Sequence, residues 1–131
     1  MASHRSFRLF YRVLGACLGI GTAACGGVAH DLHAATELYR DARYEAVQAW
    51  IAQLRNEYAD MSRTQRAEFH YLSGMTAYRL AQPDEALHEL ALAAHAARER
   101  PCPPCALGNE QLALLYRTLE ELMANRFKAA R

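Results

Sequence analysis

Apolar residues recur at intervals of three and four along the chain after residue 30, and this spacing constrains the fold most strongly. In residues 44–58, for example, Val47, Ile51, Leu54 and Tyr58 would form one stripe along a helix. β-Branched residues, which favour strands, are scarce in the same region, whereas Ala, Leu, Glu and Arg, which favour helices, are abundant. The sequence therefore predicts an all-α fold.

Turn and capping signals divide residues 31–131 into five expected helices. These lie at about 32–40, 44–58, 62–80, from 83 to the prolines at 101–104, and from 109 onward. Ser62 and Gln65 form a capping-box pattern, and Pro83 suits the first turn of a helix. The apolar stripes expected on the last three helices are Phe69, Leu72, Met75 and Tyr78, then Leu87, Leu90, Ala91 and Ala94, then Leu112, Leu115, Leu119 and Leu122.

The first 24 residues differ in composition from the rest of the chain. Residues 1–12 are basic, no acidic residue precedes Asp31, and residues 13–24 are uncharged. Such a stretch matches the apolar region of a signal peptide and is too short to span a bilayer, which takes about 20 apolar residues. Its glycines disfavour the alternative, a buried N-terminal helix. The sequence predicts an export signal over residues 1–24.

Small residues precede Cys25, and two glycines follow it. This segment resembles the lipobox of bacterial lipoproteins, although Thr22 stands where Leu is usual. The resemblance implies that Cys25 carries a lipid, that residues 25–33 form a flexible tether, and that the protein is anchored to the outer membrane facing the periplasm. The alternative is ordinary secretory cleavage, which would leave a soluble periplasmic protein.

The charge of the remaining chain excludes one class of partner. Removing residues 1–24 takes away three of the fifteen Lys+Arg, so that twelve remain against fourteen Asp+Glu, a net charge of −2. The basic residues that remain form no stripe. Because nucleic-acid binding needs clustered Lys and Arg, no nucleic-acid partner is expected.

Residues 74–93 carry a pattern of small, aromatic and turn residues: Gly74, Ala77, Tyr78, Pro83, Asp84, Glu85, Ala86, Leu90 and Ala93. The pattern resembles a tetratricopeptide (TPR) repeat, a helix–turn–helix unit of 34 residues. His70 stands at the usual Trp position and Ala81 at the usual turn Gly, and the preceding helix pair is a weaker copy. The resemblance implies a TPR-like domain over 34–131, built of antiparallel helix pairs with the fifth helix as a cap. A generic helix bundle is the alternative.

Repeats of this kind usually bind protein segments in a groove lined by the first helix of each pair. The resemblance places Tyr39, Glu68, Tyr71, Tyr78 and Arg79 on that face as partner-binding residues. Tyr and Arg are common anchors of interfaces, but Tyr71 and Tyr78 could instead fill the core, and Met75 is expected to do so. Two repeats make a shallow groove, so the protein is expected to dock onto a larger partner or to form a homodimer.

Cys102 and Cys105 flank two prolines and form a CxxC motif. A thioredoxin-type site needs a βαβ setting, haem attachment needs a His where Ala106 stands, and a zinc site needs two more ligands than this segment supplies. A structural disulfide between the two cysteines is therefore favoured in an oxidising compartment, with free thiols as the alternative.

The sequence holds no pattern that predicts catalysis, a cofactor or a metal site. His30 and His33 fall in the expected tether, His70 is expected to border the core, and Glu85 and Glu89, like Glu120 and Glu121, are expected on solvated helix faces. We therefore expect an adaptor that holds a protein partner at the membrane, and not an enzyme. An exported protein that uses the Cys102–Cys105 pair chemically, or a soluble periplasmic helical domain, is the alternative.

Overall fold

The computed structural model describes residues 27–98 and 107–131, and every regular element in these ranges is a helix. The elements are α1 (Val28–Arg40), α2 (Tyr44–Leu54), the 3₁₀ segment η1 (Arg55–Asp60), α3 (Arg63–Arg79), α4 (Pro83–Arg98) and α5 (Asn109–Ala129). The prediction of an all-α fold is confirmed. The predicted export signal, Cys25, Cys102 and Cys105 lie outside the described residues.

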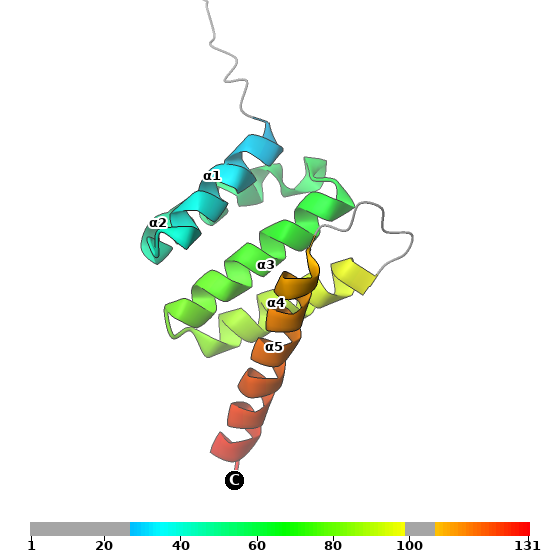
Figure 1. The fold of residues 1–131 in the computed structure, drawn as a ribbon. Helices are drawn as coiled ribbons and strands as arrows, with labels where there is room; N and C mark the ends of the chain where they lie inside the picture. The colour runs from blue at the N-terminus through cyan, green and yellow to red at the C-terminus, as the bar shows by residue number, and fades with distance from the viewer. Residues whose placement is uncertain (1–26, 99–106) are drawn as a thin grey trace, which may run out of the picture.

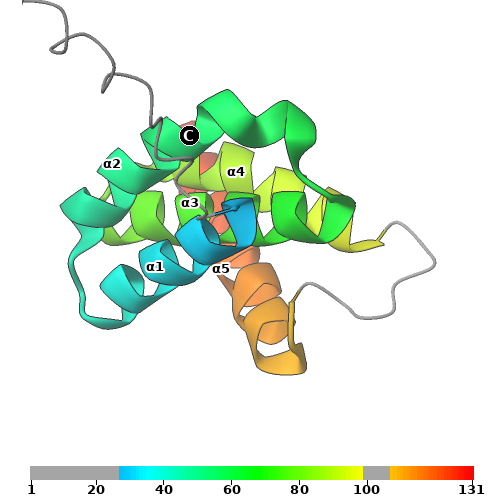
Figure 2. The same cartoon turned by 90° about the horizontal axis from the view of Figure 1, so that it is seen from above.

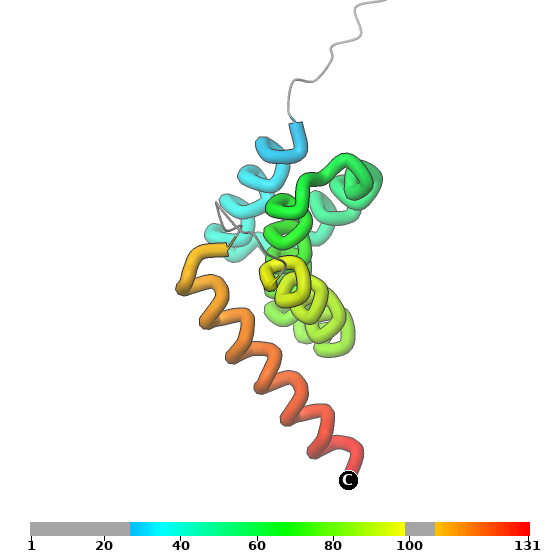
Figure 3. Tube along the Cα trace, turned by 90° about the vertical axis from the view of Figure 1, so that its right-hand side faces the viewer, coloured from blue at the N-terminus to red at the C-terminus, as the bar shows by residue number. Residues whose placement is uncertain are grey.

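Helix α3 is the centre of the molecule, in contact with α1, α2 and α4 (Figures 1 and 2). Helix α5 packs on α4 and extends beyond the other helices at its C-terminal end (Figures 1 and 3). Beyond Leu122 every residue of α5 is exposed, including Met123 and Phe127. The start of α1 and the end of α5 therefore lie at opposite ends of the molecule.

Two clusters of apolar side chains form the core, and α3 contributes to both. One cluster joins α1, α2 and α3 and includes Leu32, Val47, Ile51, Leu54, Phe69 and Leu72. The other joins α3, α4 and α5 and includes Tyr71, Met75, Leu90, Leu115, Leu119 and Leu122. Most residues of the apolar stripes predicted for the second, third and fifth helices are thus found in the core, as is Met75. Tyr58, Tyr78 and Leu112 are partly buried and pack against it. On α4, however, Ala91 is exposed, so the predicted stripe of that helix was wrong at this position.

The turns that join α1 to α2 and α3 to α4 have the same geometry. Each contains an alanine in the left-handed region, Ala42 with φ 57° and Ala81 with φ 55°. In each turn the next amide donates a hydrogen bond to the carbonyl five residues earlier, which is a Schellman-type helix end. These bonds run from Arg43 to Leu38 at 3.0 Å and from Gln82 to Ala77 at 2.9 Å. The chain therefore builds two helix–turn–helix units with one kind of turn.

Small residues let α3 and α4 approach closely. A Cβ at Gly74 would lie 2.7 Å from Cγ of Leu90 and 2.9 Å from its backbone nitrogen, both closer than real Cβ contacts. Ala86 and Ala93 on α4 are fully buried. The three positions that the repeat pattern required to be small are therefore positions at which the packing leaves no room for a larger side chain.

The structure corrects two predicted boundaries at helix starts and ends. Helix α1 begins at Val28, so the predicted tether over 25–33 was wrong from Val28 onward, and residues 25–26 lie outside the described range. The reason is burial. Leu32 packs in the core, and this tertiary contact stabilises the helical turn that precedes it. The second helix was predicted to reach Tyr58 but ends at Leu54, where η1 begins.

The capping box predicted at Ser62 is present. The Gln65 amide donates to the Ser62 hydroxyl oxygen at 3.2 Å, and the Ser62 amide donates to Oε1 of Gln65 at 2.8 Å. Among the described residues, no helix is long and apolar enough to cross a membrane.

Candidate functional site

An open groove of about 610 Å³ lies where α1, α3 and the first turn of α5 meet. We name it the α1–α3–α5 groove. Its lining residues are Thr36, Tyr39 and Arg40 of α1, Glu68, Tyr71 and Leu72 of α3, and Gly108, Asn109, Glu110 and Gln111 at the start of α5. Its volume is within the range of ligand clefts, about 300–1,000 Å³.

The spacing of the lining residues explains how the groove forms. On α1 they occupy positions 36, 39 and 40, and on α3 positions 68, 71 and 72, so each helix contributes residues at i, i+3 and i+4. Residues at this spacing lie on one face of a helix. Two parallel faces thus form the walls, and the N-terminal turn of α5 closes the third side.

The aromatic wall of the groove is made by Tyr39 and Tyr71. Tyr71 is buried, and burial raises the pKa of its hydroxyl; the nearby Tyr39 raises it further, while Arg79 lowers it. Tyr39 is half-buried and stands edge-on to Tyr44, with ring centroids 5.4 Å apart. The wall is therefore rigid and largely apolar.

Glu68 is the charged group of the groove on α3. It is half-buried, and burial raises the pKa of its carboxyl, an effect that the nearby His33 of α1 opposes. Its carboxylate makes no hydrogen bond or ion pair within the part of the chain that the structure describes. A partly desolvated carboxylate in an aromatic groove is a group that favours a cationic partner.

Three of the five predicted partner-binding residues, Tyr39, Glu68 and Tyr71, therefore line one groove. Tyr78 and Arg79 lie further along α3 and do not line it. The Tyr78 hydroxyl donates to the Glu121 carboxylate of α5, with oxygen distances of 3.0 and 3.1 Å. Nε of Arg79 donates to the Tyr39 hydroxyl at 3.4 Å. Both side chains hold helices of this chain together.

Sequence reasoning missed a chain of hydrogen-bonded polar side chains on the other side of α3, with His70 and Glu89 buried at its centre. Oε2 of Glu89 lies 2.6 Å from Nδ1 of His70, and Nε2 of His70 lies 2.8 Å from the Tyr58 hydroxyl. Oε1 of Glu89 accepts from Arg55 at 2.7 Å, and Arg55 also donates to Glu85 at 3.3 Å. We name these five residues the Glu89 network.

One prediction about this region was wrong: Glu89 was expected on a solvated face but is 1% exposed. His70, which was expected to border the core, is buried and joins Tyr58 to Glu89. A signal was present in the sequence. Position 89 falls between the small interior residues Ala86 and Ala93, so the face that packs on α3 includes it.

The Glu89 carboxylate stays charged although it is buried. Burial alone would raise its pKa, but the hydrogen bonds from His70 and Arg55 outweigh burial and lower the pKa below its usual value. While Nδ1 of His70 contacts the carboxylate, Nε2 of the same ring lies within hydrogen-bond distance of the Tyr58 hydroxyl. Neither His70 nor Glu89 lines the two cavities described here. The network thus ties η1 to α3 and α4, and its exposed members Arg55 and Glu85 line the second cavity.

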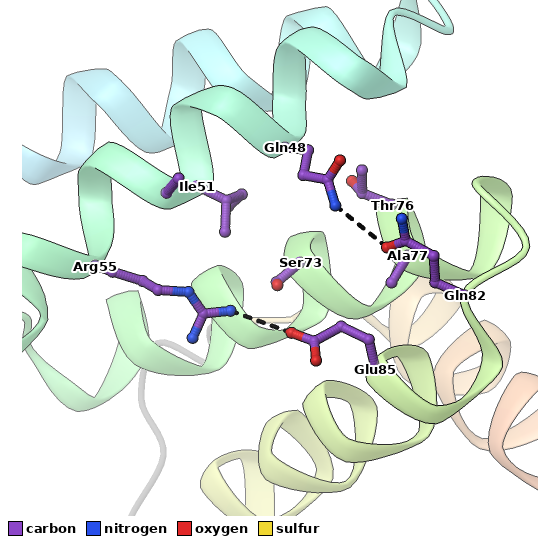
Figure 4. Close-up of a pocket in the computed structure, with 9 residues that line it drawn as sticks. Gln48, Ile51, Arg55, Ser73, Thr76, Ala77, Gln82 and Glu85 are labelled. Carbon is purple, nitrogen blue, oxygen red and sulfur yellow. Dashed lines mark hydrogen bonds and ion pairs between the residues drawn. The ribbon is translucent and has the colours of Figure 1, made fainter.

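A second cavity, of about 220 Å³, lies between α2, α3 and α4 (Figure 4). It is bridged on two sides by bonds between its own lining residues. Gln48 donates to Gln82 at 3.2 Å and Arg55 to Glu85 at 3.3 Å (Figure 4). Because a ligand would have to compete with these bonds, the α1–α3–α5 groove is the better candidate site.

Within residues 27–98 and 107–131, no three His, Cys, Asp or Glu side chains are grouped so that they could hold a metal ion. The chain matches no protein-family model, no curated protein and no solved structure.

Proposed function

We propose that the protein is a lipid-anchored adaptor of the bacterial cell envelope whose TPR-like domain binds a segment of a protein partner in the α1–α3–α5 groove. The observation that supports this most directly is the groove itself, in which Tyr39, Glu68 and Tyr71 come together. Aromatic and charged side chains at the floor of an open groove are the usual anchors of an interface. The two helix–turn–helix units with matching turns are consistent with a repeat scaffold.

The anchor is proposed at Cys25, with the domain on the periplasmic side of the outer membrane. Several acyl chains, at about 0.8 kcal/mol per buried CH₂, would hold a protein on a membrane without a spanning helix. Because α1 begins only three positions after Cys25, at Val28, the domain would stand close to the bilayer. The tip of α5 would then point away from it.

Photo-crosslinking tests partner binding. A photoreactive residue is placed at Thr36 or Gln111, which line the groove, or at His88, which is exposed on α4 and serves as the control. We expect crosslinked partner adducts in cells from the two groove positions and none from His88. Equal adducts from all three positions would contradict groove binding.

Metabolic labelling with a fatty acid tests the anchor. We expect label in the wild-type chain and no label in Cys25→Ala. Cys17→Ala is the matched control, because Cys17 is the other cysteine among the first 25 residues, and it should be labelled like the wild type. Absence of label from the wild-type chain would contradict the anchor and leave groove binding open to its own test.

A further inference from the structure

We propose that the α1–α3–α5 groove recognises a Lys or Arg side chain of the partner segment, with Glu68 as its counter-ion and Tyr39 and Tyr71 as its walls. This inference rests on the proposed function and specifies the chemistry of the partner.

The first support is the unsatisfied state of Glu68. Its carboxylate is half-buried and has neither a hydrogen bond nor an ion pair among the described residues, whereas the buried Glu89 has both. Burial raises the pKa of the Glu68 carboxyl more than the nearby His33 lowers it, in keeping with a carboxylate that is partly removed from water. A cation entering the groove would relieve that penalty, because an opposite charge within a few ångströms favours the ionised carboxylate.

The aromatic walls support the same occupant. Tyr39 and Tyr71 line the groove beside Glu68 from two different helices. An ammonium or guanidinium group next to a tyrosine ring gains cation–π attraction, and the apolar stem of Lys or Arg packs against the ring edges. A carboxylate between aromatic surfaces therefore suits a long cationic side chain better than a small inorganic cation.

The remaining charges of the groove disfavour an anionic occupant. Glu110 adds a second carboxylate at the start of α5, and Arg40 is already paired with Glu37 of its own helix. At the start of α5, the amide of the capping residue Gly108 donates to Oε1 of Gln111 at 2.9 Å. An anion would meet the two carboxylates of Glu68 and Glu110, and the Glu110 carboxylate also offsets the partial positive charge of the N-terminal turn of α5.

The volume supports a peptide segment and not a single free amine. The groove of about 610 Å³ is open and extends from Glu68 to the first turn of α5, so neighbouring residues of a segment would also make contact. Affinity for the segment would be shared between the cationic anchor and these contacts.

The test is a selection from a displayed library of random peptides. The full-length chain in detergent serves as the immobilised target. We expect peptides selected on the wild-type chain to carry Lys or Arg at one common position. They should bind Glu68→Gln at least about tenfold more weakly, as expected for loss of a charged pair in an interface. Glu120→Gln, an exposed carboxylate on α5, is the matched control and should bind like the wild type.

Charge reversal provides the second arm. Selection on Glu68→Lys should enrich Asp or Glu at the same peptide position, provided that circular dichroism shows an unchanged helix content. Binding of the wild-type peptides should also weaken as salt is added. Tight binding of N-acetyl-lysine amide alone would overturn the assignment to a peptide segment.

The failures of the two proposals are distinguishable. Selected peptides that crosslink to Thr36 but share no basic residue, or that bind Glu68→Gln as well as the wild type, would overturn this inference and leave the adaptor function standing. Failure of the wild-type chain to select any peptide would overturn both.

Discussion

At the scale of single residues, position in the packing decides what a carboxylate does. Glu68 and Glu89 are both glutamates on helices, and burial penalises the charge of each. Glu89 receives hydrogen bonds from His70 and Arg55. These bonds stabilise the charged carboxylate more than burial destabilises it, so the pKa of Glu89 is lowered. Glu68 has no such donor among the described residues, and its pKa rises. Glu89 therefore stabilises the fold, while Glu68 is the carboxylate that we propose a partner engages.

Removing the Glu89 carboxylate should destabilise the protein strongly. Glu89→Ala leaves the buried His70 without its acceptor and the half-exposed Arg55 without its closest one, and we expect a loss of about 1–3 kcal/mol in the free energy of unfolding. Glu85→Ala, which removes the exposed partner of the same Arg55, should cost less than about 1 kcal/mol. Urea denaturation followed by circular dichroism measures both. Equal losses of unfolding free energy in the two variants would contradict the role of burial in the contribution of Glu89 to stability.

The same carboxylate should make stability fall in acid. Its folded pKa lies below the ordinary value of 4.5, so the folded state binds its proton less readily than the unfolded state. The contribution is fully present above 4.5 and is lost as the pH falls through the folded pKa. We expect the difference in unfolding free energy between wild type and Glu89→Gln to shrink from about pH 7 to about pH 3. A difference that is constant over this range would contradict the assignment.

At the scale of elements, close packing and turn geometry carry the architecture. The interface of α3 with α4 depends on Gly74 facing Leu90, and each helix pair turns through an alanine with positive φ. The sequence pattern predicted the small positions because they recur at fixed places along a helix. It did not predict that both turns would have the same geometry. A positive φ is a backbone conformation that favours glycine, so an alanine in the sequence gives no signal for it.

Gly74→Ala should destabilise the protein although alanine is the better helix former. The added Cβ would lie 2.7 Å from Cγ of Leu90, and the shift this forces should cost about 1–3 kcal/mol. Gly27→Ala is the control, because a Cβ there meets nothing within 4 Å, and it should change stability by less than about 0.5 kcal/mol. Thermal unfolding of the two variants shows whether Gly74→Ala lowers or raises stability. Helix propensity alone would make alanine at this position stabilising.

Replacing the turn alanines by glycine should stabilise the protein. Ala42 and Ala81 have φ of 57° and 55°, a conformation that costs an ordinary residue about 1–2 kcal/mol and glycine very little. The greater freedom of glycine in the unfolded chain offsets about 0.4–1 kcal/mol of this gain. We expect Ala42→Gly and Ala81→Gly each to add roughly 0.5–1 kcal/mol to the unfolding free energy. A loss of stability in denaturant titrations of both variants would be inconsistent with strain in these turns.

At the scale of the whole molecule, α3 joins the two core clusters. Phe69 and Leu72 belong to the cluster with α1 and α2, and Tyr71 and Met75 belong to the cluster with α4 and α5. The Glu89 network adds a polar connection across the same helix. Because one helix is shared, the clusters should unfold together.

Trp50 allows this coupling to be measured. It is the single tryptophan of the chain and packs against the cluster of α1 and α2. Leu115→Ala, a cavity in the other cluster, should lower the unfolding free energy reported by Trp50 fluorescence by about 2–5 kcal/mol. Phe127→Ala, at a side chain that is 72% exposed, should leave it unchanged within about 0.5 kcal/mol. A Trp50 transition unaffected by Leu115→Ala would mean that the two clusters unfold independently.

What the sequence by itself determined was local: the helical class, the capping box at Ser62, the start of α4 at Pro83, and the stripes of α2, α3 and α5. These features depend on residues three or four positions apart, and a helix repeats on that scale. The resemblance of the helix pairs to a repeat also predicted that Tyr39, Glu68 and Tyr71 share one groove-lining face.

Only the tertiary structure decided which polar residues are buried and which remain available. Glu89 meets His70 from 19 positions away and Arg55 from 34, and no local spacing encodes such a meeting. Likewise, the first turn of α5 closes the groove beside Glu68, and this contact depends on how α5 packs across the helix pairs. Burial is a property of the assembled fold, and it makes Glu89 a structural carboxylate and underlies the proposed role of Glu68 in binding a cation.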